Sequence, residues 1–221
     1  MAHPAACLFD LDGLLLDTEP LHAQAWQMAA QHFGCPLSSA QLMALRGRRR
    51  LDCTKTVRTW ILENGGEDPG SDQLLAVRQP VAEALLIHAQ PTRGAKQLVD
   101  TCGALGIPIA LATSSSRQAV ALKAAPHPWL EQIRTRVHGD DPELGAGKPA
   151  PDVFLLAARR LGVDPGACWA FEDSPAGAHS AMAAGCRVFV VPPAQMDSAE
   201  LAAAYPPGIH LLNHLGEVEL S

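Results

Sequence analysis

The chain has 221 residues, of which 48% are hydrophobic and 18% are charged, and its formal net charge is −6. This length is sufficient for one sizeable hydrophobic core with a smaller second domain. The acidic balance argues against a nucleic-acid-binding surface, which requires a basic face. The sequence has no secretory signal at its start and no apolar run long enough to span a membrane. We therefore expect a cytoplasmic protein with no membrane or nucleic-acid partner.

Five short apolar runs predict β-strands, and most of them are continuously apolar, as strands buried on both faces of a parallel sheet are. These runs lie at 5–9, 107–112, 134–138, 167–171 and 186–192. Stretches with helical patterns separate the later strands. The alternation predicts an α/β fold with a doubly wound, Rossmann-like parallel sheet.

A long segment with only helical patterns separates the first two predicted strands. Ser38 is a predicted N-cap within it, and we expect Pro80 to kink or split the last of its helices. The segment is too long for a simple crossover between parallel strands. We therefore expect an α-helical domain inserted at residues 16–90, and a core domain made of residues 1–15 and 91–221.

Polar side chains follow four of the predicted strands. Ligands of doubly wound sheets bind beyond the carboxyl ends of the strands, so these side chains are candidate site residues. In chain order they are Asp10, Asp12, Thr113, Ser114, Lys148, Glu172 and Asp173. Carboxylates, hydroxyl groups and a lysine at one sheet edge predict a magnesium-dependent phosphoryl-transfer site.

Each residue type has a physical role in such a site. Asp10 and Asp173 can supply hard oxygen ligands to Mg²⁺, and Asp10 can attack phosphorus once the metal offsets its repulsion with phosphate. Asp12 can protonate the leaving alcohol and then deprotonate the attacking water. Thr113 and the amides at the start of the next helix can bind phosphate oxygens, and Lys148 can supply fixed positive charge.

Each of these residues also has an ordinary structural interpretation. An Asp-Gly pair is common in turns, Thr113 and Ser114 can cap a helix, and Lys148 can be a solvated loop residue. Glu172 and Asp173 can simply favour the positive end of the next helix. The coincidence of all of them at successive strand ends favours a functional site.

These motifs resemble those of the haloacid dehalogenase superfamily, in the group with a helical cap inserted after the first strand. They are D-x-D-G-x-x-x-D-T-E at residues 10–19, the strand-end Thr113, Lys148 in GKPAPDVF, and the acid pair in FEDSPAG. The resemblance implies that Asp10 is the nucleophile and Asp12 the acid/base. It also implies a Mg²⁺ site formed by Asp10, Asp12 through its carbonyl, and Asp173, with Glu172 beside them.

Within this superfamily the pattern is most similar to phosphatases of the pseudouridine-5′-phosphatase and glycerol-3-phosphatase type, and the β-phosphoglucomutase type is close to it. The cap features of the mutase type map onto His22 and Arg50, so we expect these two residues and Ser114 to contact substrate. Thr113 stands where the mutase type usually has serine, which favours a phosphatase.

The expected function is therefore Mg²⁺-dependent hydrolysis of a small phosphorylated metabolite, a sugar phosphate or nucleoside monophosphate, through a phosphoaspartyl intermediate on Asp10. Two alternatives stay open: a phosphomutase of the β-phosphoglucomutase kind, and a non-catalytic module that is phosphorylated on aspartate. The sequence does not identify the substrate. A monomer is expected, and a dimer is not excluded.

Overall fold

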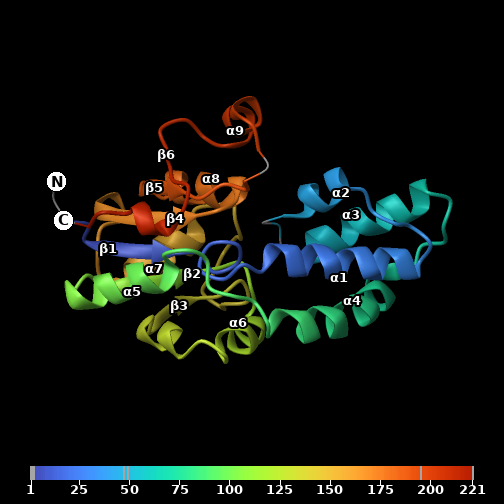
Figure 1. Ribbon diagram of the computed structural model, residues 1–221, viewed down its shortest axis with the longest axis horizontal. Helices are drawn as coiled ribbons and strands as arrows, with labels where there is room; N and C mark the ends of the chain where they lie inside the picture. Colours follow the sequence, from blue (N-terminus) through green and yellow to red (C-terminus); the bar gives the residue numbers. More distant parts are fainter. Residues whose placement is uncertain (1–2, 47, 49, 195, 221) are drawn as a thin grey trace.

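The computed structural model describes residues 3–46, 48, 50–194 and 196–220, and within them the chain forms a parallel sheet with helices on both faces (Figure 1). The six strands lie in the order β3-β2-β1-β4-β5-β6. Their bounds are β1 Ala6–Phe9, β2 Ile109–Ala112, β3 Thr135–Val137, β4 Cys168–Glu172, β5 Arg187–Val190 and β6 His210–Leu211. The expected doubly wound α/β core is confirmed.

The sheet is held by buried side chains on both of its faces. The register places Phe9 opposite Phe171 and Phe171 opposite Phe189, and both pairs stack, with ring centroids 5.0 and 5.2 Å apart. Because every residue of β1 and β4 is buried, these strands are the continuous apolar runs expected of a parallel sheet.

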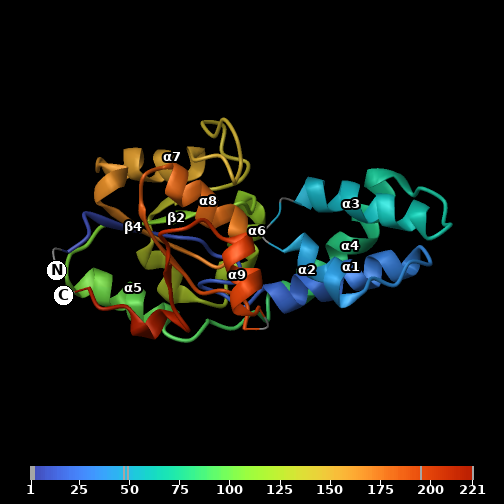
Figure 2. The same ribbon diagram turned by 90° about the horizontal axis from the view of Figure 1, so that it is seen from above.

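Helices cover the two faces of the sheet, as Figure 2 shows for α7 and α8 on one side and α5 on the other. The α-helices of this core are α5 Ala95–Ala104, α6 Arg117–Ala124, α7 Asp152–Leu161, α8 Pro175–Ala183 and α9 Ser198–Ala204. Short 3-10 helices lie at Pro128–Gln132, Pro165–Ala167 and Leu215–Glu217. None of the helices in the described ranges is long and apolar enough to cross a membrane.

A second group of helices lies beyond the sheet (Figure 1). It consists of α1 Glu19–His32, α2 Ser39–Leu45, α3 Arg50–Glu63 and α4 Gly70–Leu86, packed around its own apolar cluster. Ser38 caps α2 in a capping box with Gln41, as expected. Of the kink or split expected at Pro80, the split is wrong, because α4 runs through this exposed proline as one helix.

The chain passes between the sheet and this group twice, at two segments that lie side by side. Asp17 donates its amide to the carbonyl of Gln90, and Thr92 donates its amide to the carbonyl of Leu15. We propose that the helical group is the domain expected at residues 16–90, and we refer to it as the cap. Its position follows from β1, because the chain enters the cap directly beyond the carboxyl end of that strand.

Candidate active site

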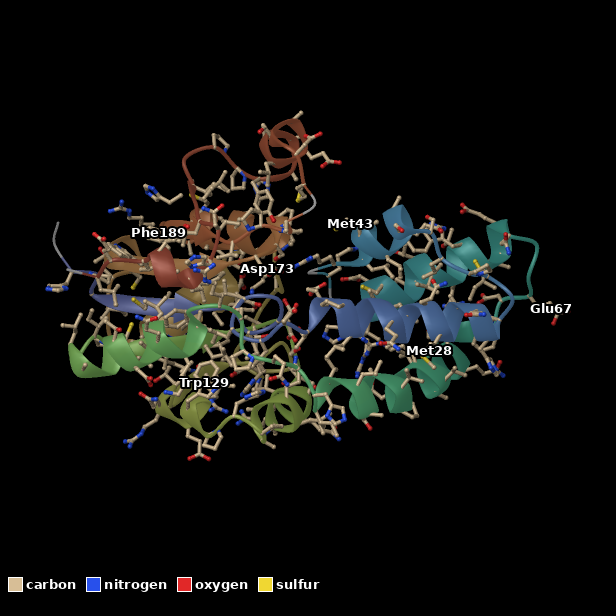
Figure 3. All side chains as sticks on the ribbon, in the orientation of Figure 1. Met28, Met43, Glu67, Trp129, Asp173 and Phe189 are labelled. Carbon is tan, nitrogen blue, oxygen red and sulfur yellow. The ribbon has the colours of Figure 1, made fainter. Side chains whose placement is uncertain are left out.

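Most of the side chains expected at the strand ends meet at the edge of the sheet that faces the cap. Asp10 follows β1, Thr113 follows the neighbouring β2, and Asp173 follows the other neighbour, β4. In Figure 3, Asp173 lies between the core and the cap. Carboxylate oxygens of Asp10, Glu172 and Asp173 all lie within 4.8 Å of one another, and all three residues are buried.

Lys148 provides the positive charge in the centre of this carboxylate cluster. Its ammonium lies 2.5 Å from Asp10 Oδ1 and 2.5 Å from Glu172 Oε1. Burial alone would lower the pKa of Lys148, but Asp10 and Glu172 raise it above its usual value. The lysine is therefore a permanent cation beside Asp10.

Glu172 is turned toward the start of α8. Its Oε2 accepts hydrogen bonds from the amide of Asp173 and from the hydroxyl of Ser174, while its Oε1 accepts from Lys148. A Cβ at Gly177 would come within about 2 Å of this carboxylate, so the glycine makes room for it. The arrangement anchors Lys148 next to Asp10.

Asp10 and Asp173 lack full compensation for their charge. Burial, opposed by Lys148 and assisted by Glu172, raises the pKa of Asp10 to about 7. Burial and the neighbouring Glu19 raise the pKa of Asp173 well above its usual value. Buried carboxylates with raised pKa values favour a bound cation, and this oxygen-only donor set fits Mg²⁺.

Asp12 has the opposite environment. Its Oδ1 accepts from the hydroxyl of Thr18 at 2.7 Å, its Oδ2 accepts from the hydroxyl of Ser115 at 2.7 Å, and Lys123 Nζ lies 2.6 and 2.5 Å from the two oxygens. Burial would raise the pKa of Asp12, but Lys123 and His22 hold it well below its usual value. Asp12 is therefore held as a carboxylate.

The turn between β2 and α6 places hydroxyl groups at the start of a helix. Thr113 Oγ1 accepts the amide of Ser115, and the hydroxyl of Ser114 is buried with no partner among the residues that the structure describes. Ser116 caps α6, and a Cβ at Gly139 would lie 2.1 Å from the carbonyl oxygen of Ser114. The amide of Arg117 donates to Asp140 Oδ1. Hydroxyl groups at a helix N-terminus are typical of phosphate sites.

A cavity of about 710 Å³ lies between the core and the cap, and all of the expected site residues except Glu172 line it. Arg50 lines it, is exposed, and donates to Gln79 Oε1 at 3.2 Å. His22 also lines it, with Nε2 3.4 Å from Asp12 Oδ1 and Nδ1 2.8 Å from Arg78 Nη2. Because burial lowers the pKa of His22, the neutral ring can donate to Asp12 and accept from Arg78.

The family of haloacid dehalogenase-like hydrolases matches residues 4–185. The chain belongs to this family. The probable pseudouridine-5′-phosphatase of Drosophila melanogaster is 37% identical to this haloacid dehalogenase-like hydrolase over 193 residues, which cover 84% of this chain and 80% of that protein. (DL)-glycerol-3-phosphatase 2 of Arabidopsis thaliana is 33% identical over 195 residues, or 86% and 80% of the two proteins.

The fold is also shared with a solved structure, a HAD hydrolase of family IA, variant 3, from Entamoeba histolytica. It matches with a TM-score of 0.81 and 28% identity, over 99% of this chain and 96% of that one. The resemblance expected from the motifs is thus confirmed at the level of the family.

Three polar residues of this hydrolase were not expected from its sequence, Arg78, Ser115 and Lys123, and the contact of Arg46 with a core carboxylate was not expected either. Arg46 extends from the cap, with Nη2 3.1 Å from Asp173 Oδ2 and Nε 3.7 Å from Glu19 Oε2. Lys123 looks in the sequence like a single solvated lysine in an apolar helix, yet it is fully buried. Only the three-dimensional structure brings Arg46, Ser115 and Lys123 to the carboxylates.

Proposed function

We propose that the chain is a Mg²⁺-dependent phosphatase that hydrolyses a small phosphorylated metabolite through a phosphoaspartyl intermediate on Asp10. The observation that carries this proposal is the contrast between Asp10 and Asp12. Asp10 shares one lysine with Glu172 and has a raised pKa, whereas Asp12 is held ionised by Lys123. The raised pKa marks Asp10 as a carboxylate that needs the charge of a metal ion, and the contacts of Asp12 with Lys123 hold it beside Asp10 for proton transfer.

Asp10 and Asp173, with the backbone carbonyl oxygen of Asp12, would hold the metal ion, and Glu172 lies beside them. When bound, Mg²⁺ supplies the positive charge that offsets repulsion between carboxylates and a phosphate dianion. Lys148 stays next to Asp10 and provides a second, fixed positive charge for the phosphate oxygens.

The chemistry divides into two steps. In the first, Asp12, which is ionised in the free site, takes up a proton from solvent as the substrate binds. The Asp10 carboxylate then forms a bond to phosphorus while the bond to the leaving alcohol breaks, and Asp12 gives that proton to the alcohol oxygen. In the second, Asp12 takes a proton from the water that attacks the phosphoaspartate. Phosphate then leaves, Asp12 releases its proton to solvent, and both carboxyl groups return to their starting forms.

The substrate would lie with its phosphate at the core and its remaining part under the cap. Thr113, Ser114 and the amides at the start of α6 are proposed phosphate contacts, and His22 and Arg50 are proposed contacts from the cap. The cavity volume of about 710 Å³ is in the range of small-molecule sites. The names of the two relatives, a probable pseudouridine-5′-phosphatase and a glycerol-3-phosphatase, support a small phosphorylated metabolite, and the first of them supports a nucleoside monophosphate.

The test is phosphate release from a panel of sugar phosphates, nucleotides, glycerol phosphate and phosphoglycolate, with and without Mg²⁺. Asp10→Asn removes the nucleophile and should abolish turnover of every substrate. Asp100→Asn is the matched control, because it makes the same change in a surface ion pair with Lys96. Full activity in Asp10→Asn would refute the mechanism.

The same experiments separate the two alternatives. A phosphomutase would convert β-glucose 1-phosphate to glucose 6-phosphate when primed with a bisphosphate, and it would release little free phosphate. A signalling module would keep a phosphoaspartate on Asp10 for hours and release no phosphate catalytically.

A further inference from the structure

Lys123 is an unusual residue for its position in the fold. It lies in α6, its side chain is 0% exposed, and its ammonium contacts both carboxylate oxygens of Asp12 and the hydroxyl of Ser115 at 2.8 Å. A buried charge is costly unless it is closely paired, and an apolar residue would fill such a site at lower cost. The charge of Lys123 therefore serves Asp12 and not the packing of the helix.

The partners of Asp12 come from two parts of the molecule. Thr18 and His22 lie at the start of the cap, in and next to α1. Ser115 and Lys123 belong to the core, where α6 is fixed by the buried Val120. Any movement of the cap relative to the core changes the first pair of contacts and leaves the second pair in place.

Ser115 connects this ion pair to the proposed phosphate site. Its hydroxyl donates to Asp12 Oδ2 and accepts from Lys123, and its amide donates to Thr113 Oγ1 at 3.1 Å. Lys123 itself is not among the residues that line the cavity, whereas Ser115 and Asp12 are. Lys123 can therefore influence a bound substrate only through other residues.

We propose that Lys123 is a positioning residue for Asp12, which it fixes together with Ser115 at a set distance from the phosphate-binding turn. The inference rests on the proposed function. In the step that it serves, Asp10 forms its bond to phosphorus while the bond from phosphorus to the leaving oxygen breaks. The electron pair of that bond stays on the leaving oxygen, which takes the proton that Asp12 has acquired from solvent as the substrate binds.

The test compares two leaving groups in Lys123→Met, which keeps the length of the side chain and removes its charge. An alkyl phosphate needs a proton on its leaving oxygen, whereas p-nitrophenolate leaves without one. General acid catalysis contributes about 100-fold or more. We expect kcat/KM to fall about 100-fold for the best alkyl phosphate of the panel, and to change less than about threefold for p-nitrophenyl phosphate.

A second readout comes from the p-nitrophenyl phosphate reaction itself. Its kcat/KM reports transfer to Asp10, whereas kcat includes hydrolysis of the phosphoaspartate, for which Asp12 is the base. We expect kcat and KM to fall together in Lys123→Met, and a burst of p-nitrophenolate to precede the steady state. Substitution of a residue that only stabilises the fold would produce neither this joint fall of kcat and KM nor the burst.

Arg160→Met is the matched control, because it removes a cation from another ion pair of the core, the one with Asp141, whose side chain is 1% exposed. Arg160→Met should change kcat/KM by the same factor for the alkyl phosphate and for p-nitrophenyl phosphate. If Lys123→Met does not fold, Ser115→Ala keeps the ion pair and removes its link to the turn. This variant should show the same preference for p-nitrophenyl phosphate at about 10-fold.

The inference would be overturned if Lys123→Met lowered kcat/KM equally for both substrates, or lowered it for neither. A gain on the alkyl phosphate would also overturn it, because Lys123 would then act only by suppressing the acid form of Asp12. Failure of the wild-type protein to hydrolyse either substrate would instead refute the proposed function, so the two failures are distinguishable.

Discussion

A methyl group added at Gly13 should lower both the stability of the protein and its catalytic rate, for two different physical reasons. Its φ is +81°, and a Cβ built there would lie 2.2 Å from Asp173 Oδ2 and 2.7 Å from its Cγ. Ordinary van der Waals contact begins at 3.4 Å. Gly13→Ala therefore requires the carboxylate of Asp173 to move by about 1 Å, away from the position where it would hold the metal.

Two costs follow from this change, and they can be measured separately. The left-handed backbone conformation costs a residue other than glycine about 1–2 kcal/mol, which should appear in the free energy of unfolding. Misplacing a catalytic group by about 1 Å can cost about 100-fold in rate, which should appear in kcat/KM for phosphate release. Binding of Mg²⁺, measured by calorimetry without substrate, should weaken as well.

Gly162→Ala is the matched control for Gly13→Ala. Gly162 ends α7 with a φ of +72°, and a Cβ there would meet nothing within 4 Å. Both variants should lose similar stability in urea denaturation, and only Gly13→Ala should lose activity and metal affinity. The reasoning is refuted if the two variants agree in kcat/KM to within about threefold.

Three further predictions follow from the ion pairs and the metal site. Arg46→Gln removes the cap cation from Asp173 and should tighten Mg²⁺ binding a few-fold in calorimetry, whereas Arg48→Gln, which loses a bond to a threonine hydroxyl, should not. The guanidinium of Arg160 lowers the pKa of Asp141 in the folded protein below its usual 3.8. The contribution of this ion pair to the free energy of unfolding is therefore complete above pH 3.8, and it is lost as the pH falls through the pKa that Asp141 has in the folded protein. Arg160→Met should thus lose about 2 kcal/mol of unfolding free energy at pH 7 and less below pH 4, and a difference independent of pH would contradict this. Chelation by EDTA should abolish phosphate release, and added Mg²⁺ should restore it; activity that survives chelation would exclude the proposed metal dependence.

The sequence predicts the sheet well because buried parallel strands are continuously apolar. The runs at 5–9 and 167–171 became the central strands β1 and β4, and their carboxyl ends are adjacent because the strands pair directly. The edge strand β6 was missed, because it consists of His210–Leu211, and both residues are exposed. A two-residue exposed strand leaves no hydrophobic pattern to find.

The residues that set the environment of each carboxylate were not predictable in the same way. Lys123 lies 111 positions from Asp12, and Arg46 lies 127 positions from Asp173. Neither contact can be predicted from the separation of the two residues in the sequence, because the first depends on how α6 packs on the sheet and the second on where the cap places the end of α2. The sequence therefore indicates which carboxylates gather, but not which cation each of them receives.

The distribution of those cations explains why acidic residues can be crowded at the end of β1. Among the residues that the structure describes, five carboxylates are in ion-pair contact with three cations. The acids are Asp10, Asp12, Glu19, Glu172 and Asp173, and the bases are Arg46, Lys123 and Lys148. If all of them are ionised, two negative charges remain, which is the charge that one divalent ion supplies. Burial raises the pKa values of Asp10 and Glu19 to about 7, as expected where that charge is missing. The cation nearest to Asp173 comes from the cap, so withdrawal of the cap would leave that carboxylate more dependent on the metal.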